Sequence, residues 1–231
     1  MAFKRGKKYR AVAKLLEKGK TYSVEEAAAL LKKTATTKFD SSVDVAFKLN
    51  LDTKQPDQQL RGTLVLPHGN GRTKKILALT RTKQADAKAA GADFVGDVDY
   101  LEKIQKENWF GFDVIVATPD MMGQIGRLGR VLGPKGLMPN PKTGTVTMNI
   151  GEAIKEIKNG KVEYRTDKDG NIQLPIGKVS FSDKDLADNI HSIINLVNQV
   201  KPASVKGTYI QDISVSTTMG PAIKINPVAS K

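Results

Sequence analysis

The spacing of apolar residues changes twice along this chain of 231 residues, and this constrains the fold more than any other feature. In 43–51 apolar and polar residues alternate, which is typical of a half-buried strand, and 60–66 predicts a second strand. From 75 to 117 short apolar runs alternate with helical stretches, which predicts a parallel sheet with crossover helices. After residue 149 the first pattern returns. There we expect helices at 150–158 and from about 183 to 200, and strands at 161–166, 172–181, 209–215 and 222–225.

This double change predicts two domains of different class. A discontinuous α+β domain with a split β-α-β arrangement is expected to comprise 1–67 plus 160–231. A Rossmann-like three-layer α/β domain is expected to be inserted between them at 68–159. Near the start we predict a basic helix at about 6–18, followed by a helix that begins with a capping box at 23–26.

Charge and composition narrow the class of partner. The chain has 37 Lys and Arg against 24 Asp and Glu, a net charge of +13, with no Cys and two His. A disulfide framework, a thiolate zinc site and a multi-histidine metal site are therefore excluded. The charge is gathered: 1–20 carries eight basic residues and one acid, while 72–83 and 121–145 contain no acid. We therefore expect a polyanionic partner, nucleic acid before membrane, and no membrane span.

A glycine- and proline-rich segment at 123–144 is the densest local signal. We predict a rigid loop there, because glycine permits close backbone approach and proline stiffens the chain. The interleaved basic residues would let this loop lie against phosphates, and they are Arg127, Arg130, Lys135 and Lys142.

Three known motifs compete for parts of the sequence. A Walker A loop fails, because Lys14 stands where the first glycine before Gly19-Lys20-Thr21 is required. A dinucleotide fingerprint lacks its leading glycine pair and its preceding strand. The Ile-Gly-x-x-Gly pattern of KH domains fits residues 125–132 better. A nucleotide-binding α/β enzyme and a free KH-like RNA regulator therefore remain alternatives, although no catalytic constellation is visible.

The segment 126–145, GRLGRVLGPKGLMPNPKTGT, closely resembles the signature of the bacterial large-subunit ribosomal protein L1 family. The resemblance extends over nearly the whole chain. Further matching segments are KFD at 38–40, RGT at 61–63, LPHG at 66–69, ATPD at 117–120, ADNI at 187–190 and STTMGP at 216–221.

This resemblance implies a function and a binding site. Members of the family bind a structured junction in large-subunit rRNA, form a mobile stalk near the tRNA exit site, and assist release of deacylated tRNA. Bacterial members also repress translation of their own operon by binding its mRNA. The implied rRNA and mRNA contacts are Glu26, Lys38, Phe39, Lys168, Ser216, Thr218, Met219 and Gly220, while the basic residues of the glycine-rich segment are candidate contacts to tRNA or stalk RNA.

The resemblance also implies what the protein lacks. We expect a non-enzymatic protein without cofactor or metal, present as a monomer within the large subunit of the cytoplasmic ribosome. Its expected partners are large-subunit rRNA, exit-site tRNA and its own operon mRNA.

Overall fold

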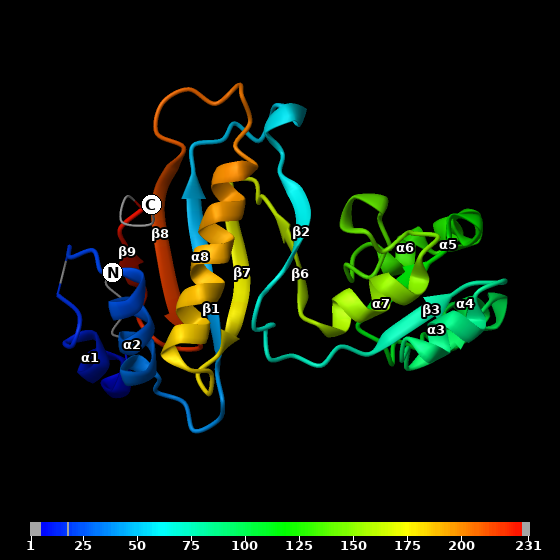
Figure 1. Cartoon of the computed structure of the whole chain (residues 1–231), viewed down its shortest axis with the longest axis horizontal. Coiled ribbons are helices and arrows are strands. Elements are labelled where there is room, and N and C mark those ends of the chain that lie inside the picture. Colours follow the sequence, from blue (N-terminus) through cyan, green and yellow to red (C-terminus); the bar gives the residue numbers. More distant parts are fainter. Residues whose placement is uncertain (1–5, 18, 228–231) are drawn as a thin grey trace. The chain divides into compact units, whose positions relative to one another are not determined.

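A computed structural model describes residues 6–17 and 19–227 (Figure 1). The chain forms two compact units. Unit 1 consists of Met1–Gly71 and Val162–Lys231, and unit 2 is the continuous segment Arg72–Lys161. The boundaries between the units therefore follow residues 71 and 161, whereas the sequence pattern predicted them after 67 and 159.

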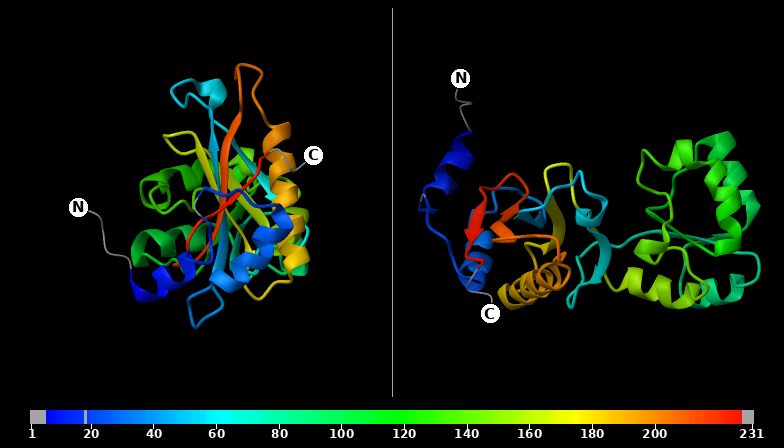
Figure 2. Two further views of the ribbon diagram at one scale, coloured as in Figure 1. Left: turned by 90° about the vertical axis from the view of Figure 1, so that its left-hand side faces the viewer. Right: turned by 90° about the horizontal axis from the view of Figure 1, so that it is seen from above.

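Unit 1 is built on a four-stranded antiparallel sheet of order β7-β1-β8-β9. Two helices, α2 and α8, pack against it and against each other, and both lie on the same face (Figures 1 and 2). The strands are β1 Ser42–Leu49, β7 Asn171–Lys178, β8 Ile210–Thr217 and β9 Ile223–Ile225, and the helices are α2 Val24–Thr34 and α8 Asp183–Gln199.

Alternation within β1 explains why the sheet has one buried face. Val43, Val45 and Phe47 are at most 1% exposed and belong to the core beneath α2 and α8. Asp44 and Lys48, which alternate with them, are exposed. The predicted half-buried strand is thus confirmed, and its polar side chains form an open sheet face.

The remaining elements of unit 1 extend this core. The expected capping box is present, since the Ser23 hydroxyl accepts from the amide of Glu26 and the Glu26 carboxylate accepts from that of Ser23. The basic helix α1, Lys7–Ala13, ends earlier than expected, and residue 18 of that expected helix lies outside the described residues. A short sheet pairs β2 Arg61–Val65 with β6 Lys161–Arg165, and one turn of 3-10 helix, η1, spans Pro56–Gln58.

Unit 2 has a parallel sheet of order β4-β3-β5 between two helical layers, as the fold-class prediction required. Leu77 and Leu79 of β3 pack in one core with α4 and α5, whereas Ile76 and Ala78 pack in a second core with α3 and α7. The elements are β3 Ile76–Leu79, α3 Gln84–Ala89, β4 Phe94–Gly96, α4 Val98–Glu107, β5 Val114–Ala117, α5 Met122–Arg127, α6 Gly129–Leu132 and α7 Ile150–Lys158.

The loop predicted at 123–144 is wrong over its first half. After the 3-10 turn η2, Pro119–Met121, the chain forms α5 and α6, and irregular structure begins only at Gly133, before the 3-10 turn η3, Pro141–Thr143. Ile125, Leu128 and Leu132 lie three and four residues apart and are at most 5% exposed in the core. Their burial on one helical face outweighs the low helix propensity of the glycines. Among the described residues, no helix is long and apolar enough to cross a membrane.

Candidate nucleic-acid interface

Two segments far apart in the sequence meet at one end of the four-stranded sheet of unit 1. Val43 at the start of β1 pairs with Thr217 at the end of β8. Just beyond this pair, the backbone amide and the hydroxyl of Thr218 donate to the carbonyl oxygen of Ser42, at 3.1 and 3.3 Å. The loop 35–41 and the turn 217–220 are therefore held side by side by a contact that spans 176 residues.

The turn 217–220 has a tightly constrained backbone. The amide of Gly220 donates to the carbonyl oxygen of Thr217 at 2.8 Å, and Met219 has a φ of +65°. A Cβ atom at position 220 would lie 2.3 Å from the Thr217 Oγ1 and 3.3 Å from the carbonyl oxygen of Thr34. Only glycine fits there without displacing neighbours. The turn consequently projects Met219 into solvent, with 76% of that residue exposed.

A groove of about 440 Å³ opens beside this turn. Its two sides are the beginning of α1 and the junction of the loop 35–41 with the turn. The lining residues are Gly6, Lys8, Tyr9, Thr36, Thr37, Met219 and Gly220.

The structure brings most of the expected RNA contacts to this end of the sheet. Phe39, on the loop 35–41, is 63% exposed. Ser216 lies opposite Asp44 on the open face, two residues before Thr218. We call this group the junction surface, and it consists of Lys38, Phe39, Ser216, Thr218, Met219 and Gly220.

Two expected contacts lie apart from the junction surface. Glu26 is eight residues from the end of α2 that approaches Gly220, about 12 Å along the helix. Lys168 precedes β7, whose first residue pairs with Lys48 near the far end of β1. The eight residues of β1 span about 23 Å, so Lys168 and the junction surface lie at opposite ends of the sheet.

The open sheet face connects these two ends. Its central positions carry small or uncharged side chains, since Ala46 lies between Ser214 of β8 and Gln173 of β7. None of these three residues is buried. Uncharged side chains therefore occupy the middle of this face, between Asp44 near Thr218 and Lys48 toward Lys168.

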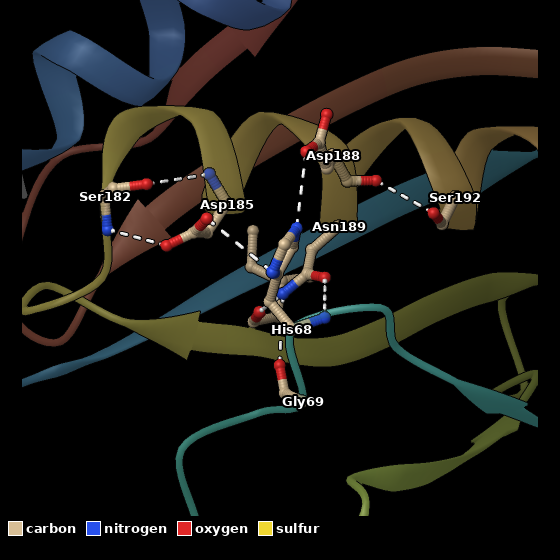
Figure 3. A network of polar contacts seen from close by, with 8 residues as sticks. His68, Gly69, Ser182, Asp185, Asp188, Asn189 and Ser192 are labelled. Carbon is tan, nitrogen blue, oxygen red and sulfur yellow. Dashed lines mark hydrogen bonds and ion pairs between the residues drawn. The ribbon is translucent and has the colours of Figure 1, made fainter.

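A polar clamp that sequence reasoning missed fixes the chain where unit 1 leads into unit 2 (Figure 3). Asn189 of α8 is fully buried and makes three backbone contacts. Its Oδ1 accepts from the amide of His68 at 3.2 Å, while its Nδ2 donates to the carbonyl oxygens of Gly69 and Ile176 at 3.1 and 2.8 Å. We call Asn189 and these three partners the Asn189 clamp. Its residues belong to the motifs at 66–69 and 187–190 and to β7. The sequence showed both motifs, but it did not show that they contact each other.

Acidic side chains of α8 face the imidazole of His68 beside this clamp. The ring nitrogens lie 3.3 Å from an oxygen of Asp188 and 3.6 Å from one of Asp185 (Figure 3). The pKa of Asp185 is lowered, first by hydrogen bonding to the Ser182 side chain at the helix cap, with smaller contributions from the Ser182 backbone and the charges of His68 and Lys32.

In unit 2 the basic residues expected to contact RNA differ in their surroundings. Arg127, Arg130 and Lys142 are exposed, and within 6–17 and 19–227 they form no ion pair. Lys135 is instead engaged, with its Nζ 3.5 Å from the centre of the Phe110 ring.

The glycines of α5 add an open surface beside these arginines. Gly123 and Gly126 are exposed, and no atom lies within 4 Å of the position that a Cβ would occupy at either one. Neither internal packing nor a positive φ therefore requires glycine at these positions.

Two further findings bear on the class of this protein. No group of three or more His, Asp or Glu residues in the described chain could hold a metal ion. Residues 31–221 match the model of the ribosomal protein L1p/L10e family, which covers most of both units. The chain therefore belongs to the ribosomal protein L1p/L10e family, and it is a non-enzymatic, rRNA-binding protein of the large ribosomal subunit.

Proposed function

We propose that this protein is a bacterial-type L1 protein that anchors itself to rRNA of the mobile stalk through the junction surface of unit 1. The observation that carries the proposal is the contact between Thr218 and Ser42, because it builds one rigid surface from two segments that lie 176 residues apart in the sequence. A rigid surface of hydroxyls, exposed backbone and one aromatic ring suits RNA, whose shallow minor groove presents 2′-hydroxyls and phosphates.

The two separate residues fit an extended RNA contact. An RNA helix lying along the open face would reach Lys168, which supplies a phosphate contact at the far end. At Glu26, Oε2 accepts the capping hydrogen bond from the amide of Ser23. We propose that Oε1 of the same carboxylate accepts a hydrogen bond from a ribose 2′-hydroxyl.

We further propose that unit 2 contacts stalk RNA or exit-site tRNA and assists release of deacylated tRNA. Arg127, Arg130 and Lys142 offer charges that no acid of the described chain neutralises. Glycine inside a helix costs about 1 kcal/mol relative to alanine. Gly123 and Gly126 have no packing reason to be glycine, and close approach of a nucleic-acid backbone to α5 would supply one.

A second role follows if one surface serves two RNAs. We propose that the junction surface also binds an operon mRNA site and thereby represses translation. The rRNA and mRNA fragments should then compete for the protein, and one substitution in the surface should weaken both complexes by the same factor.

Met219→Ala tests the anchoring surface directly. Burying a methionine side chain stabilises by about 1.5–3 kcal/mol, and three quarters of this one is available to be covered by RNA. We therefore expect rRNA-fragment binding to weaken about tenfold in a filter-binding or calorimetric titration. Met148→Ala is the matched control, because it removes another exposed methionine, 55% exposed, in unit 2.

The outcome separates contact from folding. Equal affinities for a folded Met219→Ala variant and the original protein would remove the junction surface as the anchor. Gly220→Ala is a weaker probe, since its Cβ would meet the Thr217 hydroxyl even without RNA.

Replacing Arg127 and Arg130 together with Gln tests the role of unit 2. If these residues contact tRNA, we expect unchanged affinity for the rRNA fragment and slower release of labelled deacylated tRNA from ribosomes reconstituted with the variant. A contact to stalk RNA should instead lower the affinity for the rRNA fragment modestly. Unchanged release would refute the tRNA role, and a large loss of rRNA-fragment affinity would place the anchor in unit 2 instead.

A further inference from the structure

Helix α1 lies outside the segment that matches the family and has no evident role in the core. The family match begins at residue 31, whereas α1 spans Lys7–Ala13 and contains no buried residue. It is nevertheless held in place. Leu16, just after α1, packs against the core of unit 1, and the amide of Glu17 donates to the Tyr22 hydroxyl at 3.1 Å.

The cations of this region are not neutralised. Lys7, Lys8, Arg10 and Lys14 are exposed, and within the described ranges 6–17 and 19–227 none of them has an acidic partner. The nearest acid in the sequence, Glu17, is paired with Lys20 at 3.4 Å. A cluster of four unpaired cations, three on a short helix and one directly after it, is electrostatically unfavourable without a polyanion nearby.

The groove places one of these cations, Lys8, beside the junction surface, and Lys7 and Arg10 are its neighbours on the same short helix. Lys8 and Tyr9 form one side of the 440 Å³ groove, and Met219 and Gly220 contribute to the other. Thr36 and Thr37 lie along it as well, so the groove combines hydroxyls, an exposed apolar side chain and a cation. The lining is mostly apolar surface, which suits the faces of ribose and bases, while Lys8 and the two hydroxyls suit phosphates and 2′-hydroxyls.

We propose that α1 is the second wall of the RNA site, with Lys7, Lys8 and Arg10 binding phosphates of the same RNA that the junction surface contacts. This inference rests on the proposed anchoring role of that surface. Because phosphate contacts are insensitive to sequence, α1 supplies affinity while the turn 217–220 supplies recognition.

Salt dependence distinguishes these two contributions. Each phosphate contact changes the slope of log affinity against log salt by about 0.7–0.9. Changing Lys7, Lys8 and Arg10 together to Gln should make the slope shallower by about 2, if two to three contacts are lost. At about 0.15 M salt this corresponds to roughly 45-fold weaker rRNA binding, with unchanged affinity at an extrapolated 1 M salt.

A matched control removes the same charge elsewhere. Changing Lys184, Lys201 and Lys206 to Gln also lowers the net charge by three, at exposed positions on α8 and after it. We expect little change in its slope. Equal effects of the two triple variants, or no effect of the α1 variant, would overturn the proposal.

The distance between α1 and the RNA can be tested directly, because the chain has no cysteine and a single introduced one can carry a cleavage probe. Iron–EDTA attached to Ala11→Cys, on α1, should cleave the rRNA fragment, whereas the same probe on Asn198→Cys should not. No cleavage from position 11 would refute the second wall.

The Met219→Ala variant keeps the two hypotheses distinguishable. If Met219→Ala weakens binding and the α1 variant does not, the junction surface stands and the second wall falls. If only the α1 variant weakens binding, α1 contacts the RNA but the junction surface does not anchor it, so the anchoring proposal fails and α1 is not the second wall of that site.

Discussion

Asn189→Ala is the sharpest test of how unit 1 holds the chain that leads into unit 2. The substitution removes one acceptor and one amide donor from a fully buried position. The amide of His68 and the carbonyl oxygens of Gly69 and Ile176 then lose their partner.

The expected cost follows from these three hydrogen bonds. Each contributes about 1 kcal/mol net, so the sum is about 3 kcal/mol. The contacts to His68 and Gly69 are only partly buried, and water can replace Asn189 there. The contact to Ile176 is buried and leaves its carbonyl oxygen unpaired. We therefore expect the free energy of unfolding of unit 1 to fall by about 2–3 kcal/mol.

Urea unfolding measures this loss, and the aromatic residues separate the two units. Trp109 is the single tryptophan and lies in unit 2, so its fluorescence reports that unit. Four of the five tyrosines, including Tyr164 and Tyr209, lie in unit 1. Asn189→Ala should shift the tyrosine and circular-dichroism transition of unit 1, and hydrogen exchange should quicken in 66–71.

Asn198→Ala is the control, since it makes the same change at an exposed position of the same helix. Alanine favours helix at that position, so unit 1 should be unchanged or slightly more stable. The free energies of unfolding of the two variants should differ by clearly more than the contribution of half a hydrogen bond. If they differ by less than about 0.5 kcal/mol, the Asn189 clamp does not hold this segment.

Three further predictions concern unit 1. The Tyr209 hydroxyl is buried without a partner in the described chain, and burial raises its pKa to about 12, so Tyr209→Phe should preserve stability at neutral pH. Because an unfolded tyrosine ionises near 10, the original protein should lose stability between pH 10 and 12, as followed by urea midpoints, and the variant should lose less. The pKa of Asp185 lies below its ordinary 3.8, chiefly because its carboxylate is hydrogen-bonded to Ser182. The ionised carboxylate therefore stabilises the fold, and this stabilisation is lost as the pH falls. Asp185→Asn should lose less unfolding free energy between pH 5 and pH 3 than the original protein, and an equal loss would contradict this. Gly170→Ala should cost about 1–2 kcal/mol in thermal or urea unfolding, because φ is +79° and its Cβ would lie 3.1 Å from the carbonyl oxygen of Leu51.

The sequence predicted the elements whose signals are local. The capping box at Ser23 and Glu26 depends on residues three apart, and the alternation in β1 depends on neighbours. The change to a parallel sheet in unit 2 was visible for the same reason. Where distant packing decides, the prediction was wrong: Ile125 and Leu132 bury themselves against β3 and α4, and so the glycine-rich segment begins as helix.

In the candidate site, too, the sequence did not show which distant segments contact each other. The resemblance named the residues of the RNA site, but it did not show that Thr218 bonds to Ser42. It also did not show that Lys168 lies at the other end of the sheet, because this follows from the register of β7 on β1. The contact of Asn189 with Gly69 joins residues 120 positions apart, so no periodic pattern in the sequence could indicate it.

The discontinuity of unit 1 also has a consequence during synthesis. Unit 2 is a continuous segment, so it can fold as soon as residue 161 has left the ribosome, while β1 still waits for β7 and β8. By bringing its own ends together, a folded unit 2 shortens the effective loop between β2 and β6 and lowers the entropy cost of closing unit 1. The junction surface forms only after both β1 and β8 have been made, because the turn 217–220 follows β8 in the chain. A nascent or truncated chain that stops before this turn lacks the surface, so the proposed capture of RNA requires that β8 and its turn have already been made.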